Sequence, residues 1–401
     1  MKNTSNDLFD HLKKFDNCCF INEIYFQAQQ KKKCNTNKTK KKFKYILSKL
    51  SLVIYMLITI GITVFNLPFK YKIDNKKEIA IARVSREKRK IEKVFPNLQY
   101  ITDDIKNMDF SIYRIGKRRD RIKFIVTKFV VQCFNEIKII SKILVSKNIF
   151  IDKETILLWC AKRIPHTIIY KNFVEIIVSN YDNNAVYVGV THERFAIITE
   201  NITKKYKKRL ICVPHGIETT EKMPREYIGD TFFCSSDNMA KKLNDLYNTT
   251  KFIYDKNVTK KMLKIKNNVC SEEVKIVFFT MPLYYVEEAK SIINEISKLL
   301  KNYNKKLYIK VHPNENYKDY VFENCEFISD FDEAIYKNIC ISIQSTALIE
   351  AIYNNSIAIS AIHIIDRTLI LKNEHEFLND DKILKPNSFR DMIFLINKVY
   401  C

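Results

Sequence analysis

The sequence contains few glycines and prolines, and this scarcity excludes several classes of protein. Its 401 residues include 5 glycines and 8 prolines, too few for collagen-like, glycine/serine-linker or proline-rich architectures. It has neither a G-x-G-x-x-G nor a G-x-x-x-x-G-K-[ST] motif, so dinucleotide-dependent dehydrogenases and P-loop NTPases are excluded too. With 46% hydrophobic and 28% charged residues, the chain is expected to be globular, with about two or three domains.

Paired cysteines and metal-ligand spacings are also missing. The 11 cysteines include no C-x-x-C pair and no His/Cys spacing that is typical of a zinc site. Several of them lie in apolar, strand-like runs, as Cys212 does in residues 209–213. This placement is typical of buried, reduced thiols. The sequence therefore predicts a cytosolic protein without disulfides, metal or cofactor.

Negative charge is scarce relative to positive charge. The chain has 68 Lys and Arg against 45 Asp and Glu, a formal charge of +23. Much of the excess is lysine accompanied by many isoleucines and asparagines, a bias that A/T-rich codon usage alone would produce. The lysines nevertheless crowd residues 31–33, 40–42, 44 and 49, and such patches favour anionic membrane surfaces. No basic motif with interleaved aromatic residues occurs, so we expect no nucleic-acid partner.

The segment that follows these lysines, residues 50–69, has no charged side chain. Its twenty residues are about the length that crosses a bilayer. Its polar side chains include Ser51, Thr59, Thr63 and Asn66, and lysines flank both ends. Two placements stay open: a spanning or membrane-dipping helix, and a buried or interfacial one. The segment begins too far from Met1 for an ordinary cleaved signal peptide. We expect the protein on the cytoplasmic face of the inner membrane.

From residue 78 onward, short apolar runs alternate with helical stretches, a pattern that predicts βαβ units and parallel sheets. The expected strands are 79–84, 109–113, 185–190, 209–213 and 231–234, then 273–279, 306–311, 338–343 and 356–360. Helices are expected over about 120–145 and 387–400. The predicted fold class is α/β, with two Rossmann-like domains facing a cleft. The expected parts are a polar leader with the apolar helix (1–77), an acceptor domain (78–255), a linker (256–272) and a nucleotide-donor domain (273–401).

Polar side chains follow two expected strands of the second domain. In open parallel sheets, ligands bind beyond the carboxyl ends of the strands. His312 follows one strand and could donate a hydrogen bond to a phosphate oxygen. Ser345 and Thr346 follow the next expected core strand, where hydroxyls and bare N–H groups at a helix start make an anion cradle. Glu350 could reach a sugar hydroxyl. A turn histidine, helix-capping hydroxyls and a solvated glutamate are the alternative interpretations.

The first domain has two comparable strand ends. Residues 209–213 lead into His215, which precedes a glycine and could face the cleft as a base. Residues 185–190 lead into His192, Glu193 and Arg194, which are candidate acceptor-side groups. The remaining histidines are expected to be structural: His11, His166, His363 and His375.

Three short motifs resemble a known group of enzymes. They are P-H-G at residues 214–216, K-V-H-P at 310–313 and S-x-x-S-T-A-x-x-E-A at 342–351. In order and spacing they resemble bacterial surface-polysaccharide transferases of the GT-B fold, particularly capsule and lipooligosaccharide sialyltransferase-like enzymes. CDP-glycerol and CDP-ribitol phosphotransferases are similar in pairing an HG motif with an HP motif.

The two resemblances imply different roles for the same residues. In the sialyltransferase-like group, the HP histidine and the Ser/Thr pair bind the phosphate of a CMP-activated sugar, which implies this role for His312, Ser345 and Thr346. The acidic D/E-D/E-G motif that usually supplies the base there is absent from this sequence. The polyol-phosphate enzymes imply His215 as the base, although their HGTP motif is replaced here by His215-Gly-Ile-Glu218.

The resulting hypothesis is a metal-independent, membrane-associated glycosyltransferase. It would move a sugar, such as sialic acid or a related acidic sugar, from a CMP-activated donor to a surface glycan or glycolipid. His312, Ser345 and Thr346, with Glu350, would form the donor site, and His215 or Glu193 would be the base. His192 and Arg194 would lie on the acceptor side, and an anionic membrane surface would be a further partner. The alternatives are a CDP-polyol phosphotransferase and a noncatalytic scaffold of polysaccharide export.

Overall fold

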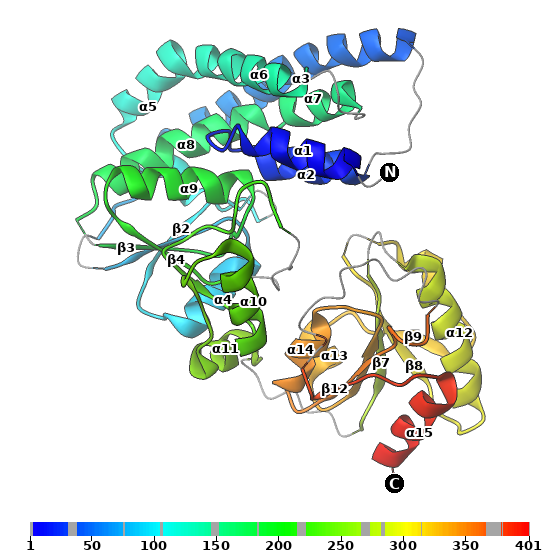
Figure 1. The fold of residues 1–401 in the computed structure, drawn as a ribbon. Helices are drawn as coiled ribbons and strands as arrows, with labels where there is room; N and C mark the ends of the chain where they lie inside the picture. Colours follow the sequence, from blue (N-terminus) through cyan, green and yellow to red (C-terminus); the bar gives the residue numbers. More distant parts are fainter. Residues whose placement is uncertain are drawn as a thin grey trace. The chain divides into compact units, whose positions relative to one another are not determined.

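The chain forms two compact units in a computed structural model (Figure 1). The first unit comprises Met1–His215, Lys222–Phe233 and Thr249–Ile253, and the second comprises Gly216–Glu221, Cys234–Asn248 and Tyr254–Cys401. The structure describes residues 3–30, 38–74, 77–104, 107–145, 152–182, 184–214, 222–265, 273–281, 285–313, 315–365, 378 and 380–400.

A parallel six-stranded sheet forms the centre of the first unit. Its strand order is β2-β1-β3-β4-β5-β6. Every side chain of β1 and β3 is buried, as expected for central strands whose two faces are both covered. The strands are β1 (Ile79–Ala82), β2 (Gln99–Thr102), β3 (Ala185–Val188), β4 (Arg209–Cys212), β5 (Thr231–Phe233) and β6 (Phe252–Ile253). Helices α4 (Ser85–Val94) and α9 (Arg194–Lys205) pack against them.

A layer of helices covers α9 on the side away from the sheet (Figure 1). Within it, α3 packs against α7 and α8, and α6 packs against the same two helices. The elements are α1 (Asn3–Lys13), α2 (Ile21–Gln30), α3 (Lys38–Asn66), η1 (Ser111–Arg114), α5 (Arg118–Phe124), η2 (Ile125–Phe129), α6 (Val130–Leu144), α7 (Lys153–Ala161) and α8 (Ile164–Ser179). Part of the expected polar leader is thus folded into this unit, and Phe20, Ile21 and Ile24 are fully buried.

A second parallel six-stranded sheet forms the centre of the second unit, with the order β12-β11-β10-β7-β8-β9. Renumbered along the unit and read from the β9 edge, this order is 3-2-1-4-5-6, the Rossmann arrangement. The strands are β7 (Ile276–Phe279), β8 (Leu307–Lys310), β9 (Cys325–Phe327), β10 (Ile339–Ser342), β11 (Ile357–Ser360) and β12 (Ile383–Leu384). The helices are α10 (Asp237–Tyr247), α11 (Lys256–Leu263), α12 (Val286–Lys301), η3 (Tyr317–Tyr320), α13 (Phe331–Ile335), α14 (Ala347–Ile352) and α15 (Phe389–Tyr400).

The two sheets confirm the predicted α/β class with a pair of Rossmann-like domains, the make-up of a GT-B-like fold. One expected strand was wrong. Residues 109–113 begin with an isolated antiparallel bridge between Asp104 and Asp109 and then form the 3₁₀ helix η1, while β2 was not expected. Part of the expected linker forms α11. The predicted cleft between the domains stays a prediction.

Candidate functional site

His312 lies at the carboxyl edge of the second sheet, two residues beyond β8. Its side chain is half-buried, and its backbone N–H donates a hydrogen bond to Thr280 Oγ1 at 2.9 Å. The Thr280 hydroxyl in turn donates to Glu315 Oε2 at 2.6 Å, and the Glu315 N–H donates to the His312 carbonyl at 2.9 Å. These bonds tie the turn that carries His312 to the end of β7, so the position of His312 is fixed by two strands.

Ser345 and Thr346 follow β10 at the same edge of this sheet. Both are half-buried, and the Ser345 N–H donates to Ser342 Oγ at 3.2 Å, while Ser345 Oγ accepts from the Ala347 N–H at 3.3 Å. Thr346 is the N-cap residue of α14 but makes no side-chain cap. The Ser345 hydroxyl therefore stabilises the start of the helix, and the Thr346 hydroxyl has no capping role.

His312 and the Ser345–Thr346 pair lie on either side of β7, so they do not end successive strands as expected. In the sheet, β7 pairs with β8 on one side and β10 on the other, whereas β9 intervenes between them along the chain. Since neighbouring strands lie about 4.8 Å apart, the ends of β8 and β10 are about 10 Å apart. The Met281 Sδ atom, just after β7, lies 3.3 Å from the Gln344 N–H. The structure thus brings His312 and the Ser345–Thr346 pair to the point where the strand order reverses, which is where such sheets bind ligands.

Glu350 has a different setting from the one expected. Its residue is only 5% exposed, within α14, which has six residues. The expected alternative of a solvated glutamate is therefore wrong, because the side chain is buried. Because α14 is so short, its dipole would contribute little to binding a phosphate. The hydroxyl and imidazole groups are therefore the main candidates for phosphate binding on this edge.

In the first unit, His192 and Glu193 lie between β3 and α9. Glu193 is the N-cap residue of α9, and its Oε2 atom accepts hydrogen bonds from the N–H groups of Thr191 (3.0 Å) and His192 (3.2 Å). His192 Nδ1 lies 2.8 Å from Thr191 Oγ1, and its ring lies against Phe26 from α2, with 5.4 Å between centroids. His215 and His375 lie outside the described residues, so their predicted roles stay predictions.

Gly189 precedes these residues, and a glycine is needed there because α4 comes very close to the backbone. A Cβ atom at Gly189 would lie 2.7 Å from the Glu87 Cγ atom, closer than real contacts allow. The buried Glu87 side chain accepts a hydrogen bond from the Arg83 N–H at 2.7 Å, so α4 is held against the ends of β1 and β3. This is the strand-order switch point of the first sheet.

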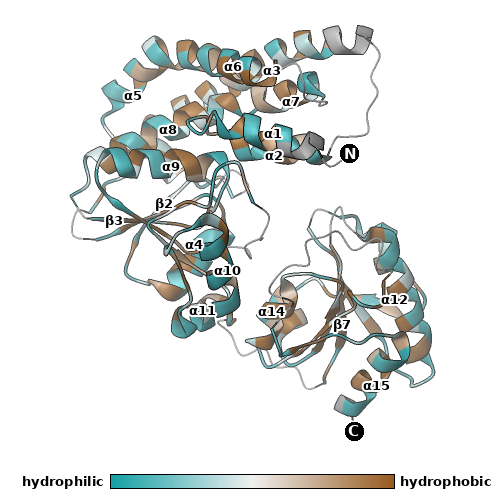
Figure 2. Ribbon diagram, in the orientation of Figure 1, coloured by the Kyte–Doolittle hydropathy of each residue, from teal (hydrophilic) through white to brown (hydrophobic). Residues whose placement is uncertain are grey.

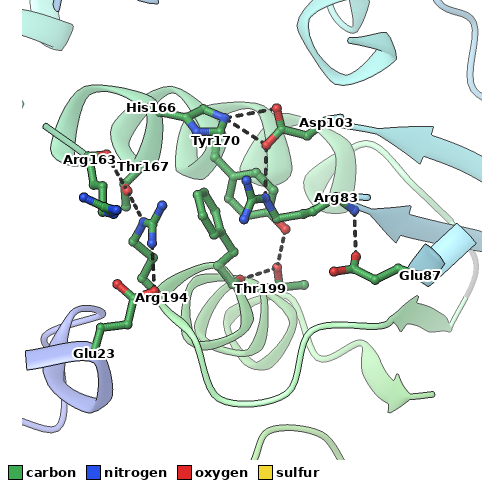
Figure 3. Close-up of polar contacts among 11 residues, drawn as sticks. Glu23, Arg83, Glu87, Asp103, Arg163, His166, Thr167, Tyr170, Arg194 and Thr199 are labelled. Atoms are coloured by element: carbon green, nitrogen blue, oxygen red, sulfur yellow. Dashed lines mark hydrogen bonds and ion pairs between the residues drawn. The ribbon is translucent and has the colours of Figure 1, made fainter. Parts of the chain in front are cut away.

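Arg83, Asp103 and His166 form a cluster at this switch point that the sequence analysis missed (Figure 3). The Asp103 carboxylate is 1% exposed and accepts from His166 Nε2 at 2.9 and 3.0 Å and from Arg83 Nε at 3.3 Å. Burial alone would raise the pKa of Asp103, but the charges and hydrogen bonds of His166 and Arg83 outweigh it and lower the pKa. His166, expected to be structural, thus belongs to a charged cluster.

Arg194 extends this cluster from the first turn of α9. Its Nη1 atom donates to Glu23 Oε1 at 2.7 Å and its Nε atom to Thr167 Oγ1 at 2.9 Å (Figure 3). The guanidinium groups of Arg83 and Arg194 lie 3.4 and 4.1 Å from the centroid of the buried Phe195 ring. Such cation–π contacts hold both cations at fixed positions.

A sequence signal for this cluster does exist. Arg83 directly follows β1, although the expected strand ran on to residue 84, and Asp103 directly follows β2, which was not expected. Ending the expected strand at Ala82 would have identified Arg83 by the rule that ligands bind where the strand order reverses. In the described part of the chain, no group of three or more His, Cys, Asp or Glu side chains could hold a metal ion.

No family model and no curated protein matches the sequence. Solved structures match in fold at low similarity. The UDP-GlcNAc 2-epimerase from Methanocaldococcus jannaschii is 12% identical, with a TM-score of 0.47, covering 80% of this chain and 92% of that one. The enzyme of the same name from Neisseria meningitidis, bound to UDP-GlcNAc, is 11% identical (TM-score 0.46; 81% and 91% covered). The E. coli heptosyltransferase WaaC with ADP-2-deoxy-2-fluoro heptose is 8% identical (TM-score 0.38; 80% and 99% covered). At these identities the likeness concerns the fold alone.

Proposed function

We propose that this protein is a glycosyltransferase that uses a nucleotide-activated sugar, with CMP as the nucleotide and an acidic sugar such as sialic acid as the group transferred. The observation that carries the proposal is the placement of His312 and the Ser345–Thr346 pair on either side of β7. An imidazole and two hydroxyls at the switch point of a Rossmann sheet suit the phosphate of a nucleotide.

The proposed reaction needs a phosphate site and a base. The acceptor hydroxyl attacks the anomeric carbon of the sugar, the bond from that carbon to the phosphate oxygen breaks, and CMP leaves with the electron pair. His312, Ser345 and Thr346 donate hydrogen bonds to the phosphate as its negative charge grows. The hydroxyl proton passes to His215 or Glu193, and both stay candidates for the base.

Nucleotide binding tests this proposal directly. Thermal unfolding of the purified protein should shift upward with CMP more than with CDP, UDP or GDP, because a ligand that binds only the folded state stabilises it. The His312→Ala variant should lose about 1.5–3 kcal/mol of CMP binding free energy, the contribution of a charge-assisted hydrogen bond. His11→Ala, in the first unit, is the matched control and should retain the affinity of the parent protein.

The same titrations separate the alternatives. A larger shift with CDP than with CMP would favour transfer of a polyol phosphate from a CDP-linked donor. No shift with any cytidine nucleotide would contradict the proposal. If His312→Ala left the biological activity intact, a noncatalytic scaffold of polysaccharide export would account better for the chain.

We further propose that α3 lies along the cytoplasmic surface of an anionic inner membrane, where a surface glycan or glycolipid acceptor is within reach. Phe43–Asn66 is long and apolar enough to span a bilayer by length and composition, yet its polar residues Ser51 and Thr63 face the protein. A spanning α3 would draw the adjoining Lys162 and Arg163 into the membrane, at about 2.5–3.5 kcal/mol each at its centre. An interfacial helix avoids this cost.

A further inference from the structure

A cavity of about 730 Å³ lies in the first unit, beside the cluster of Arg83, Asp103 and His166. One part of its wall is basic. The basic residues come from the end of β1, the connection between α7 and α8, and the first turns of α8 and α9. They are Arg83, Lys162, Arg163, His166 and Arg194.

Positive charge exceeds negative charge around this cavity. None of the lining residues is Asp or Glu, and the carboxylates that pair with the lining are those of Asp103 and Glu23. Among the described residues, no carboxylate lies within ion-pair distance of Lys162 or Arg163. Four permanent cations therefore meet two carboxylates, and a bound anion would compensate the difference.

The setting of Arg163 shows the effect of this excess. Its guanidinium lies 3.9 Å from the centroid of the Trp159 ring and donates to the Trp159 carbonyl at 3.1 Å. Burial and then the charge of Arg194 lower the pKa of Arg163. An anion in the cavity would relieve the repulsion between these two guanidinium groups, whose planar forks suit phosphate oxygens.

Other residues of the lining are apolar and belong to α3 and α7. They are Tyr55, Ile58, Ile62, Leu158 and Trp159. Tyr55 and Ile58 are also 38% and 50% exposed. They belong to α3, which carries many hydrophobic residues (Figure 2). The cavity thus adjoins the surface of α3 that we place at the membrane, and both cations and apolar side chains line it.

We propose that this cavity binds the phosphorylated head group of a lipid, with the phosphate at Lys162, Arg163 and Arg194 and the apolar chain against α3 and α7. The lipid is inferred from the cavity together with the placement of α3 at the membrane proposed above. Its role as the acceptor, or as the carrier of the acceptor glycan, rests on the function proposed above. The lipid head group and free phosphate present the same phosphate oxygens to the cations, so the test must compare lipid-borne and free phosphate.

The chain has a single tryptophan, Trp159, which lies in this wall and provides a built-in reporter. Three probes separate the sources of binding: dihexanoyl phosphatidic acid, dihexanoylglycerol, which has the same chains without phosphate, and inorganic phosphate. Titrated into the full-length protein, phosphatidic acid should change the tryptophan fluorescence saturably. Its half-saturation concentration should be at least about tenfold below that of dihexanoylglycerol, which lacks the charged hydrogen bonds. It should be at least about tenfold below that of inorganic phosphate too, which lacks the buried apolar chains.

Variants locate the binding within the protein. Lys162→Gln should raise the Kd for phosphatidic acid about tenfold or more, and Arg163→Gln should do the same. Because Arg163 touches the reporter, calorimetry should measure the affinity of that variant. Lys138→Gln removes the same charge from the exposed surface of α6, outside the cavity, and should bind as the parent protein does.

Each other outcome overturns the proposal. Equal binding of inorganic phosphate would indicate a site for free anions, and equal binding of dihexanoylglycerol would indicate apolar adsorption. No saturable change, or an equal effect of Lys138→Gln, would also contradict a lipid-phosphate site. Since these titrations contain no nucleotide, they can fail while CMP binding in the second unit stands, and the converse also holds.

Discussion

The buried carboxylate of Asp103 joins the ends of β1 and β2 to the first turn of α8. It accepts hydrogen bonds from Arg83 and His166, and these interactions lower its pKa. Because the folded-state pKa lies below the unfolded value of about 3.9, the ionised carboxylate stabilises the fold at any pH above that value. This contribution is lost as the pH falls through the folded-state pKa.

The Asp103→Asn variant should therefore be less stable by about 3–5 kcal/mol at pH 7, the usual effect of removing one partner from a buried ion pair. Chemical denaturation should be measured across pH 2–7, a range that includes the usual carboxyl pKa. The stability difference between the variant and the parent protein should shrink once the pH falls below about 4. Asp245→Asn, at an exposed carboxylate of α10, is the control and should leave the profile unchanged. A constant difference down to the lowest pH would contradict the assignment.

Individual site residues were predictable where they directly follow a recognised strand. His312, Ser345 and Thr346 were found in this way, and the structure brings them to one sheet edge. The cluster of Arg83 and His166 was not found, because its members are separated by more than eighty positions in sequence and meet only through Asp103. For Asp103 and His166, burial among charged partners leaves no local pattern in the sequence.

At the level of elements, the carboxyl end of α3 is held by one buried arginine. The guanidinium of Arg121, which is 2% exposed, donates to the carbonyls of Asn66 (3.2 Å), Leu67 (3.1 Å), Phe69 (3.2 Å) and Tyr113 (2.6 Å). Carbonyls at a helix end lack partners within the helix, so Arg121 supplies donors that the backbone cannot. Burial lowers the pKa of Arg121, yet the residue stays charged at neutral pH.

The Arg121→Gln variant should lose about 3 kcal/mol or more of the free energy of unfolding, because several buried carbonyls would then lack a donor. Denaturant titration measures this loss, and limited proteolysis should show earlier cleavage near residue 67. Arg119→Gln, an exposed position in the same helix α5, serves as the matched control with an effect near zero. Equal, small effects of both changes would mean that water replaces the guanidinium without cost.

Strands were easier to predict than the helical layer. Buried runs such as Ile276–Phe279 are apolar throughout, which is typical of central parallel strands. Residues 109–113 have apolar side chains at Phe110, Ile112 and Tyr113, but the hydrogen bonds between Asp104 and Asp109 turn the chain before η1. Helices α7 and α8 bury the polar side of α3. Their sequences have the pattern of core helices, and this pattern does not indicate which helix they pack against.

At the level of the whole molecule, the proposed contact with the membrane rests on α3, whose residues Phe43–Asn66 are long and apolar enough to span a bilayer. Many of its exposed residues are large and apolar, for example Leu50, Ile54, Leu57 and Phe65. On the second unit, exposed apolar side chains such as Val321 do not form part of a long apolar helix. Membrane association should therefore depend on α3 and on nearby lysines, each contributing about 1 kcal/mol on anionic lipid.

The Leu57→Glu variant should move to the soluble fraction in membrane fractionation, since a charge on this surface opposes burial in the interface. The control Val321→Glu changes a similarly exposed side chain and should leave the distribution unaltered. For the parent protein, 1 M salt, at which the Debye length is about 3 Å, should release part of the protein. Retention of Leu57→Glu and of the parent protein in high salt would instead indicate a spanning helix.

The position of α3 in the chain also affects the order of events during synthesis. The ribosome completes α3 at Asn66, whereas the helices that cover its polar side are complete only at Ser179. At about 5–20 residues per second, the helix is made roughly 6 to 23 seconds before its last partner. We therefore expect the nascent helix to meet the membrane or a chaperone first, so that the rest of the unit folds onto a helix already attached to the membrane.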